Sequence, residues 1–156
     1  MIRSISGFHS DGHDGWVAEL SCFHHQLVRH ISPHHPRPWE PEPEGRAGGV
    51  GSPIDCRLCE RAELPDGLAV VGHAGPWDQD SLPDGLRGAH RTPGGRWGRL
   101  HILEGKIDFQ FESDVNPKPR LHLHAGAAQS IPPGVAHRVV PTGPVRLQLE
   151  FLSREP

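Results

Sequence analysis

Three cysteines and several histidines near the start of the chain are residue types that bind metal ions. Cys56 and Cys59 form a CxxC pair, which presents two thiolates from one tight turn at a spacing that a tetrahedral zinc ion accepts. Cys22 and His24 supply a second pair of donors from the end of a strand. These four side chains predict a closed, structural zinc site.

The sequence leaves the histidine of this site open. His24 is favoured, His30 is the main alternative, and His25 is also near enough in sequence. In the competing interpretation Cys22 is a small buried residue and the histidines form a solvated surface. His34 and His35, in the proline-rich stretch that follows, are expected to be exposed and without a role.

A hairpin must position the first pair of ligands. The segment 3–8 alternates apolar and polar residues, turn residues follow, and 16–22 alternates again with Cys22 on its apolar face. The segment 32–53 is rich in proline and glycine and shows no hydrophobic periodicity, which predicts a long loop without regular secondary structure. A metal site would hold the two ends of this loop together. It would also stabilise a module that is too short to form a large hydrophobic core.

Short strands separated by glycine and proline turns make up the rest of the chain, which predicts a small antiparallel barrel or sandwich. The boundary is expected after Ala62, giving modules 1–62 and 63–156. The fold class is therefore mainly β. The expected strands of the second module are 67–72, 85–91, 96–112, 120–126, 128–140 and 145–153.

Composition narrows the class of protein. Only 35% of residues are hydrophobic, with 19 glycines and 17 prolines, which suits strands and turns better than packed helices. The net charge of -3, spread over both halves, argues against a nucleic-acid partner. The sequence has neither a signal-peptide core nor an apolar run of membrane-spanning length, so we expect no membrane association and a cytoplasmic location.

The first module resembles a small bacterial domain of unknown function. The family pattern runs roughly GFHxDxxGxWVAxLxCGHxQHVRH and continues to a CxxC, and this chain reads GFHSDGHDGWVAELSCFHHQLVRH and later CRLC. The chain departs from the pattern at Phe23, where the family tends to have glycine, and at Leu27, where it tends to have histidine. The resemblance thus implies a small zinc-ribbon-like module whose cysteine and histidine ligands are intact.

Residues from about 82 to 152 resemble the TehB/YeaR-like family, which is associated with tellurite resistance. His90, Thr92 and the segment 97–105 carry this resemblance, and Pro93 replaces the usual lysine. The resemblance implies a cupin-like antiparallel barrel. It also implies that the turn PPGVAHRV directs His137 into the lumen, facing His90.

A cupin metal site normally includes a carboxylate, and none stands at the expected spacing here. Glu150 is the best replacement, although strand alternation puts it opposite Leu147 and Leu149. If those leucines fill the core, Glu150 points to solvent. His101, His122 and His124 alternate with apolar residues and are expected to be ordinary strand residues; Trp97, Phe109 and Phe111 are expected in the core or a pocket wall.

The leading interpretation is a metal-binding protein with a structural zinc ion. Its barrel is expected to bind a second divalent metal ion, or a small-molecule or oxyanion ligand. The expected role is in the response to tellurite or oxyanion stress. One alternative is a metal-dependent cupin enzyme, dioxygenase- or isomerase-like, that uses His90 and His137. Another is a non-catalytic interaction module that presents the loop 37–45, with Trp39, to a partner. A homodimer is expected by analogy with other small barrels.

Overall fold

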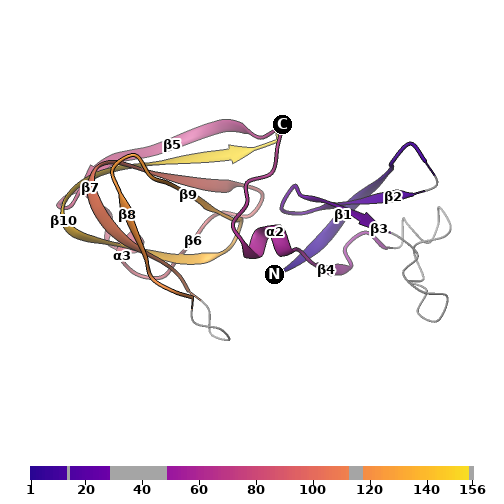
Figure 1. Cartoon of the computed structure of the whole chain (residues 1–156), viewed down its shortest axis with the longest axis horizontal. Helices are drawn as coiled ribbons and strands as arrows, with labels where there is room; N and C mark the ends of the chain where they lie inside the picture. Colours follow the sequence, from indigo (N-terminus) through magenta and orange to yellow (C-terminus); the bar gives the residue numbers. More distant parts are fainter. Residues whose placement is uncertain (14, 29–48, 113–117, 155–156) are drawn as a thin grey trace. The chain divides into compact units, whose positions relative to one another are not determined.

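The computed structural model describes residues 1–13, 15–28, 49–112 and 118–154. The chain divides into two compact units, Met1–Pro65 and Asp66–Pro156, each built on its own antiparallel sheet (Figure 1). Two short helices are described over their full length, α2 (Arg57–Glu60) and α3 (Asp84–Arg87). The predicted mainly β class is confirmed. No helix in the described part is both long and apolar enough to cross a membrane.

The first unit is a four-stranded sheet in the order β3-β2-β1-β4. Its strands are β1 (Ile2–Ser10), β2 (Trp16–Leu20), β3 (His25–Val28) and β4 (Pro53–Asp55). β1 and β2 form the predicted hairpin, with Ser10 opposite Trp16. The fourth strand, β4, pairs with β1 on the side away from β2.

The buried face of this sheet is small. Side chains alternate along the strands, so Ala18 and Leu20 of β2 are buried while Val17 and Glu19 lie on the other face. The buried apolar residues of the unit are Ile5, Ala18, Leu20, Cys22, Val28, Ile54, Cys56 and Cys59. Three of these eight are cysteines, so the metal-binding residue types are part of the core itself.

The second unit is built on two long strands, β7 (Trp97–Phe111) and β10 (Ala136–Ser153). The main sheet order is β5-β10-β7-β8, and register shifts between β7 and β10 bend both strands. The sheet therefore curls into a half-barrel (Figure 1). The remaining strands are β5 (Ala69–Asp78), β6 (His90–Arg91), β8 (Leu121–His124) and β9 (Ala128–Ile131).

The inner face of this half-barrel holds the core. Phe109 and Trp97 are completely buried, and Phe111 packs against the core, as the sequence predicts. Leu147 and Leu149 of β10 also lie in it, which puts Glu150 on the opposite face. The other core residues are Leu82, Leu100, Ile102, Ile107, Ile131, Val139 and Val145.

Several strand predictions differ from the structure: the expected strand 128–140 is divided between β9 and β10, β10 also includes the expected strand 145–153, and β5 runs on to Asp78. The prediction for 85–91 is wrong in part. The segment 85–91 was expected to be extended, but its first half belongs to α3 and only His90–Arg91 is strand. The backbone turns here because Pro83 starts the helical turn and its carbonyl accepts a hydrogen bond from the Leu86 N–H at 3.0 Å. Leu86 then packs against the barrel core, so a tertiary contact stabilises the turn.

Gly105 provides a test of the half-barrel. It lies within β7, opposite Val145 of β10, with a φ of +75°, and a Cβ there would overlap the Pro144 carbonyl oxygen. Gly126 has a φ of +90° but open space around it. We expect Gly105→Ala to lower the free energy of unfolding by about 2 kcal/mol more than Gly126→Ala, because only the first adds a steric overlap to the backbone strain. Thermal denaturation followed by circular dichroism measures both; equal losses would contradict the close approach of Gly105 to Pro144.

Candidate metal centre and barrel histidines

Four buried side chains of the first unit come together at one point. Cys22, His24, Cys56 and Cys59 each offer one ligand atom, and these atoms all lie within 4.8 Å of one another. Within the described ranges, this is the one group of three or more such residues that meets at metal-binding distance. The structure thus brings together the four residues that the sequence singles out.

The turn between β2 and β3 positions the first two ligands. The Phe23 N–H donates to the Leu20 carbonyl at 2.8 Å, and the Leu20 N–H donates to the His24 carbonyl at 3.0 Å. Closing this turn requires Phe23 to adopt a left-handed backbone with a φ of 71°. Cys22 and His24 then point to the same side, one residue apart on either side of Phe23.

A second tight turn positions the other two ligands. Cys56 precedes α2 and Cys59 lies within it, so one helical turn brings their sulfurs to the same side. The Cys56 N–H donates to the Met1 carbonyl at 2.8 Å, which ties this turn to β1. The Ala62 N–H donates to the Cys59 carbonyl at 3.0 Å and closes the end of the turn.

The Nδ1 atom of His24 lies at the centre of contacts with all three sulfurs. It is 3.5 Å from Sγ of Cys22, 3.4 Å from Sγ of Cys56 and 3.6 Å from Sγ of Cys59. The Sγ atoms of Cys22 and Cys56 are 3.9 Å apart. None of the three cysteines forms a disulfide, so all three sulfurs are available as ligands. The arrangement can hold a metal ion.

The pKa values of the three neighbouring thiols are shifted in opposite directions. A hydrogen bond with Cys59 lowers the pKa of Cys22 to about 5, despite burial. The same contact with Cys22, together with burial, raises the pKa of Cys59, and burial raises that of Cys56. Without a cation the cluster therefore holds one thiolate, and a bound metal ion would favour deprotonation of the other two thiols.

The alternative histidines divide into two groups. His25 is exposed on the outer face of the sheet, where its ring meets that of His9 edge-on at 5.1 Å between centroids. Nδ1 of His9 lies 2.8 Å from Oε1 of Glu19, so these three residues form a separate surface cluster that the sequence did not indicate. His30, His34, His35 and the loop 37–45 with Trp39 lie outside the described residues.

In the second unit, His90 and His137 lie opposite each other on paired strands β6 and β10. Their ring centroids are 5.5 Å apart, and the rings are nearly perpendicular. His137 is only 2% exposed and stacks on Phe109, with centroids 5.7 Å apart. The two histidines are therefore held at one place on the inner face of the half-barrel.

A hydrogen bond to the backbone determines which ring nitrogen of His137 carries the proton. Its Nδ1 lies 3.0 Å from the Val135 carbonyl oxygen, which can only accept, so Nδ1 carries the proton and Nε2 has a lone pair. Burial lowers the pKa of His137, and the neighbouring His90 lowers it further, while the hydrogen bond opposes the shift. The imidazole is thus neutral at pH 7.

Glu150 does not join these histidines. It lies on the outer face of the sheet, where Oε2 is 2.8 Å from Nη2 of Arg99 and 2.8 Å from Nε2 of His101. Burial would raise the pKa of Glu150, but the hydrogen bonds from His101 and Arg99 lower it overall. The carboxylate is therefore an ion-pair partner here, as the leucine alternation predicts.

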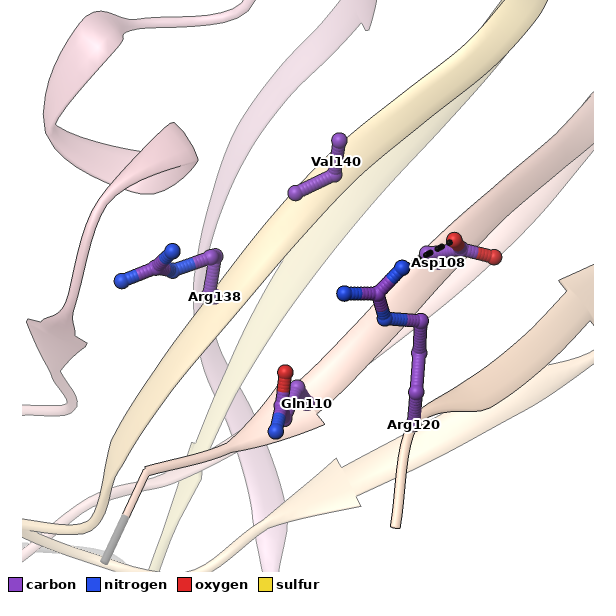
Figure 2. A pocket seen from close by; sticks show the side chains of 5 residues that line it. All are labelled: Asp108, Gln110, Arg120, Arg138 and Val140. Atoms are coloured by element: carbon purple, nitrogen blue, oxygen red, sulfur yellow. Dashed lines mark ion pairs between the residues drawn. The ribbon is translucent and has the colours of Figure 1, made fainter. Parts of the chain in front are cut away.

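A small hollow of about 80 Å³ lies on the same outer face, across β7 and β10 (Figure 2). Arg120 reaches toward Asp108, with Nη1 3.5 Å from Oδ2, and Arg138 pairs with Glu112 at 3.0 Å. Both guanidinium groups are thus already neutralised by carboxylates. The lining residues are Asp108, Gln110, Arg120, Arg138 and Val140.

Sequence reasoning missed Thr92 as a member of the barrel site. Its side chain is only 4% exposed, and its hydroxyl has no hydrogen-bond partner within the described part of the protein. Thr92 follows β6 and is two residues from His90, so an extended backbone places both on one face. The HxT spacing was the available signal, but nothing in the sequence shows that the hydroxyl is left unpaired.

Phe23 allows a test of backbone strain in the turn between β2 and β3. Phe23→Ala and Phe23→Gly both remove the ring, but only glycine adopts a positive φ without steric cost. We expect Phe23→Gly to bind metal about fivefold more tightly than Phe23→Ala, because about 1 kcal/mol of backbone strain is relieved. Competition with a chromophoric chelator measures the ratio; equal affinities would show that this turn is not strained.

Comparisons with known proteins agree with the two-unit organisation. Residues 6–63 match the model of a family described as a protein of unknown function (DUF3565), and residues 74–149 match a TehB-like domain. No curated protein gives a significant match.

Among solved structures, TehB from Haemophilus influenzae is similar with a TM-score of 0.52 and 23% identity, over 56% of this chain. The match covers 32% of TehB, so this chain spans only about a third of that protein. A protein from E. coli strain K12 is similar with a TM-score of 0.54 and 18% identity, over 60% of this chain and 97% of its own. These similarities concern the fold. The chain is thus a DUF3565 domain followed by a TehB-like domain.

Proposed function

We propose that the first unit binds one zinc ion through Cys22, His24, Cys56 and Cys59. The observation that carries this proposal is the set of distances among the ligand atoms. Zinc bond lengths of about 2.3 Å to sulfur and about 2.0 Å to nitrogen imply tetrahedron edges of about 3.5 Å between nitrogen and sulfur. The three observed distances of 3.4, 3.5 and 3.6 Å match these edges.

The donor types favour zinc over harder cations. Three thiols and one imidazole form a Cys3His set, whereas magnesium and calcium require oxygen ligands. The sulfur-to-sulfur distance of 3.9 Å between Cys22 and Cys56 also fits the tetrahedral edge of about 3.8 Å that zinc–sulfur bonds imply. An open hydrated ion would need space that this buried cluster does not offer.

The proposed role of this zinc is structural. All four ligands are buried and together complete a tetrahedral shell, which leaves no position for a substrate. The ion would join the β2–β3 turn to the turn at α2, two segments that lie more than 25 residues apart in the sequence. Because such a site is absent from the unfolded chain, the free energy of metal binding contributes to the stability of the fold.

The zinc proposal is tested by elemental mass spectrometry on the untagged full chain. We expect one zinc per chain in the wild type, loss of that zinc in His24→Ala and Cys56→Ser, and full occupancy in His25→Ala, which changes the exposed neighbour. Chelation should unfold the first unit, since about ten or more kcal/mol of zinc binding is folding free energy in comparable small domains. Zinc loss in His25→Ala alone would refute the ligand set.

We further propose that the second unit is a cupin-like barrel that binds a small ligand on its inner face at His90 and His137, with or without a divalent metal ion. The support is the position of two imidazoles opposite each other beside the buried Phe109. The resemblance to a family associated with tellurite resistance makes tellurite, or a related oxyanion, the first ligand to test. We also propose a cytoplasmic location for the chain, which suits the three cysteines of the first unit because they form no disulfide.

Calorimetric titration of the zinc-loaded chain with sodium tellurite, in buffer containing a trace of divalent metal ion, tests this second proposal. Zinc ties up the three thiols, so their reaction with tellurite is suppressed. We expect binding that is lost in His137→Ala and retained in His124→Ala, which changes an exposed histidine of β8. Absence of binding in the wild type would remove oxyanion handling as the role of the barrel.

A further inference from the structure

Arg3 is a charged residue on the buried face of the first sheet. Its neighbours in β1, Ile2 and Ser4, are exposed, whereas Arg3 shares a face with the buried Ile5. The side chain of Arg3 is half-buried as a whole, and its Nε atom is out of contact with solvent. A guanidinium group keeps its charge at any physiological pH, and a buried charge is costly unless opposite charge lies near it. The position of Arg3 therefore calls for an explanation.

On one side of β1, the strand pairing brings Arg3 to the level of the first ligand turn. The Ser21 N–H donates to the Ser4 carbonyl at 2.8 Å, which extends the pairing of β1 with β2 by one residue. The chain turns directly after Ser21, and this turn contains the buried Cys22. The turn between β2 and β3 thus begins next to the part of β1 that contains Arg3.

On the other side of β1, the strand pairing brings Arg3 to the second ligand turn. Arg3 lies directly opposite Ile54 of β4, whose side chain is buried. The Cys56 N–H donates to the Met1 carbonyl at 2.8 Å, so this pairing continues and Cys56 shares the face of Ile54. Nη2 of Arg3 contacts Sδ of Met1 at 2.9 Å, which directs the guanidinium group toward this end of β1. Arg3 therefore lies between the two segments that carry the ligands.

The charge of Arg3 acts on the cluster. A hydrogen bond with Cys22 and burial raise the pKa of Cys59, whereas the positive charge of Arg3 lowers it. Such an effect decreases with distance, so it reflects a guanidinium group near the sulfur of Cys59. This agrees with the place that the strand pairing gives to Arg3.

We propose that the guanidinium group of Arg3 is the counter-charge of the metal-loaded cluster and increases its affinity for zinc. This role rests on the proposed zinc site and adds a residue that does not touch the metal. Three thiolates and one divalent ion leave one net negative charge, because the imidazole ligand is neutral. The single positive charge of Arg3 balances it.

The other described arginines of the first unit are less suited to this role. Arg57 and Arg61 are close to the CxxC pair in sequence, but both side chains are exposed, and Arg61 pairs with Glu63. Water and salt screen an exposed charge, whereas a buried charge acts through a less polar medium. The charge of Arg3 should therefore influence the metal more strongly than the charge of either exposed arginine.

Zinc affinity of the full chain, measured against a competing chelator, tests this role. We expect Arg3→Met to bind zinc about tenfold more weakly, the size usual for residues that support a metal ligand, and Arg3→Lys to bind nearly as the wild type does. Methionine is also long and unbranched, so the first change mainly removes the charge. Arg61→Met makes the same change at an exposed position and should leave zinc affinity unchanged.

Cobalt(II) in place of zinc distinguishes loss of charge from a general loosening of the site. A positive charge lowers the energy of electrons on a nearby thiolate. Its loss in Arg3→Met should therefore move the sulfur-to-cobalt charge-transfer absorption to longer wavelength, and Arg3→Lys should restore it. The d–d bands, which report the tetrahedral geometry, should stay the same in all three proteins.

The outcomes separate this inference from the zinc site itself. Wild-type affinity in Arg3→Met, or equal losses in Arg3→Met and Arg3→Lys, would overturn the counter-charge and leave the zinc site in place. Altered d–d bands in Arg3→Met would overturn it in favour of a purely structural role. Absence of thiolate charge-transfer absorption in the wild type would overturn the zinc site and the counter-charge together.

Discussion

The convergence of three sulfurs and one imidazole on a single point is the constraint on which the first unit depends. Its buried apolar residues are few, and three of them are the cysteines themselves. Without a cation, burial and mutual repulsion leave only one of the three thiols ionised. A metal ion would remove that electrostatic conflict and cross-link the two turns. The stability of the first unit and the binding of a metal ion at this site would therefore be coupled.

The second unit is stabilised differently. Its core is a continuous apolar face along β7 and β10, and the register shifts between these strands create the curl. Burial of apolar side chains supplies its stability, and Leu147, Phe109 and Ile102 are almost completely buried.

The sequence predicts those features that depend on residue type and short spacing. The CxxC pair, the β1–β2 hairpin and the leucine face that turns Glu150 outward all follow from local pattern. The helical turn at Leu86 was missed because a packing contact, rather than propensity, decides it. Phe23 is instructive: its family resemblance indicated a glycine position, and only the structure shows the φ of 71° that explains this preference.

The unpaired hydroxyl of Thr92 lay beyond sequence reasoning for a different reason. A hydrogen bond that is absent can be recognised only when every neighbour of the group is placed in space. Once it is recognised, the two sites of the chain contrast in kind. The four side chains of the cysteine cluster are buried and could complete the coordination of one metal ion, whereas Thr92 has a buried hydroxyl without a partner in the described part of the barrel.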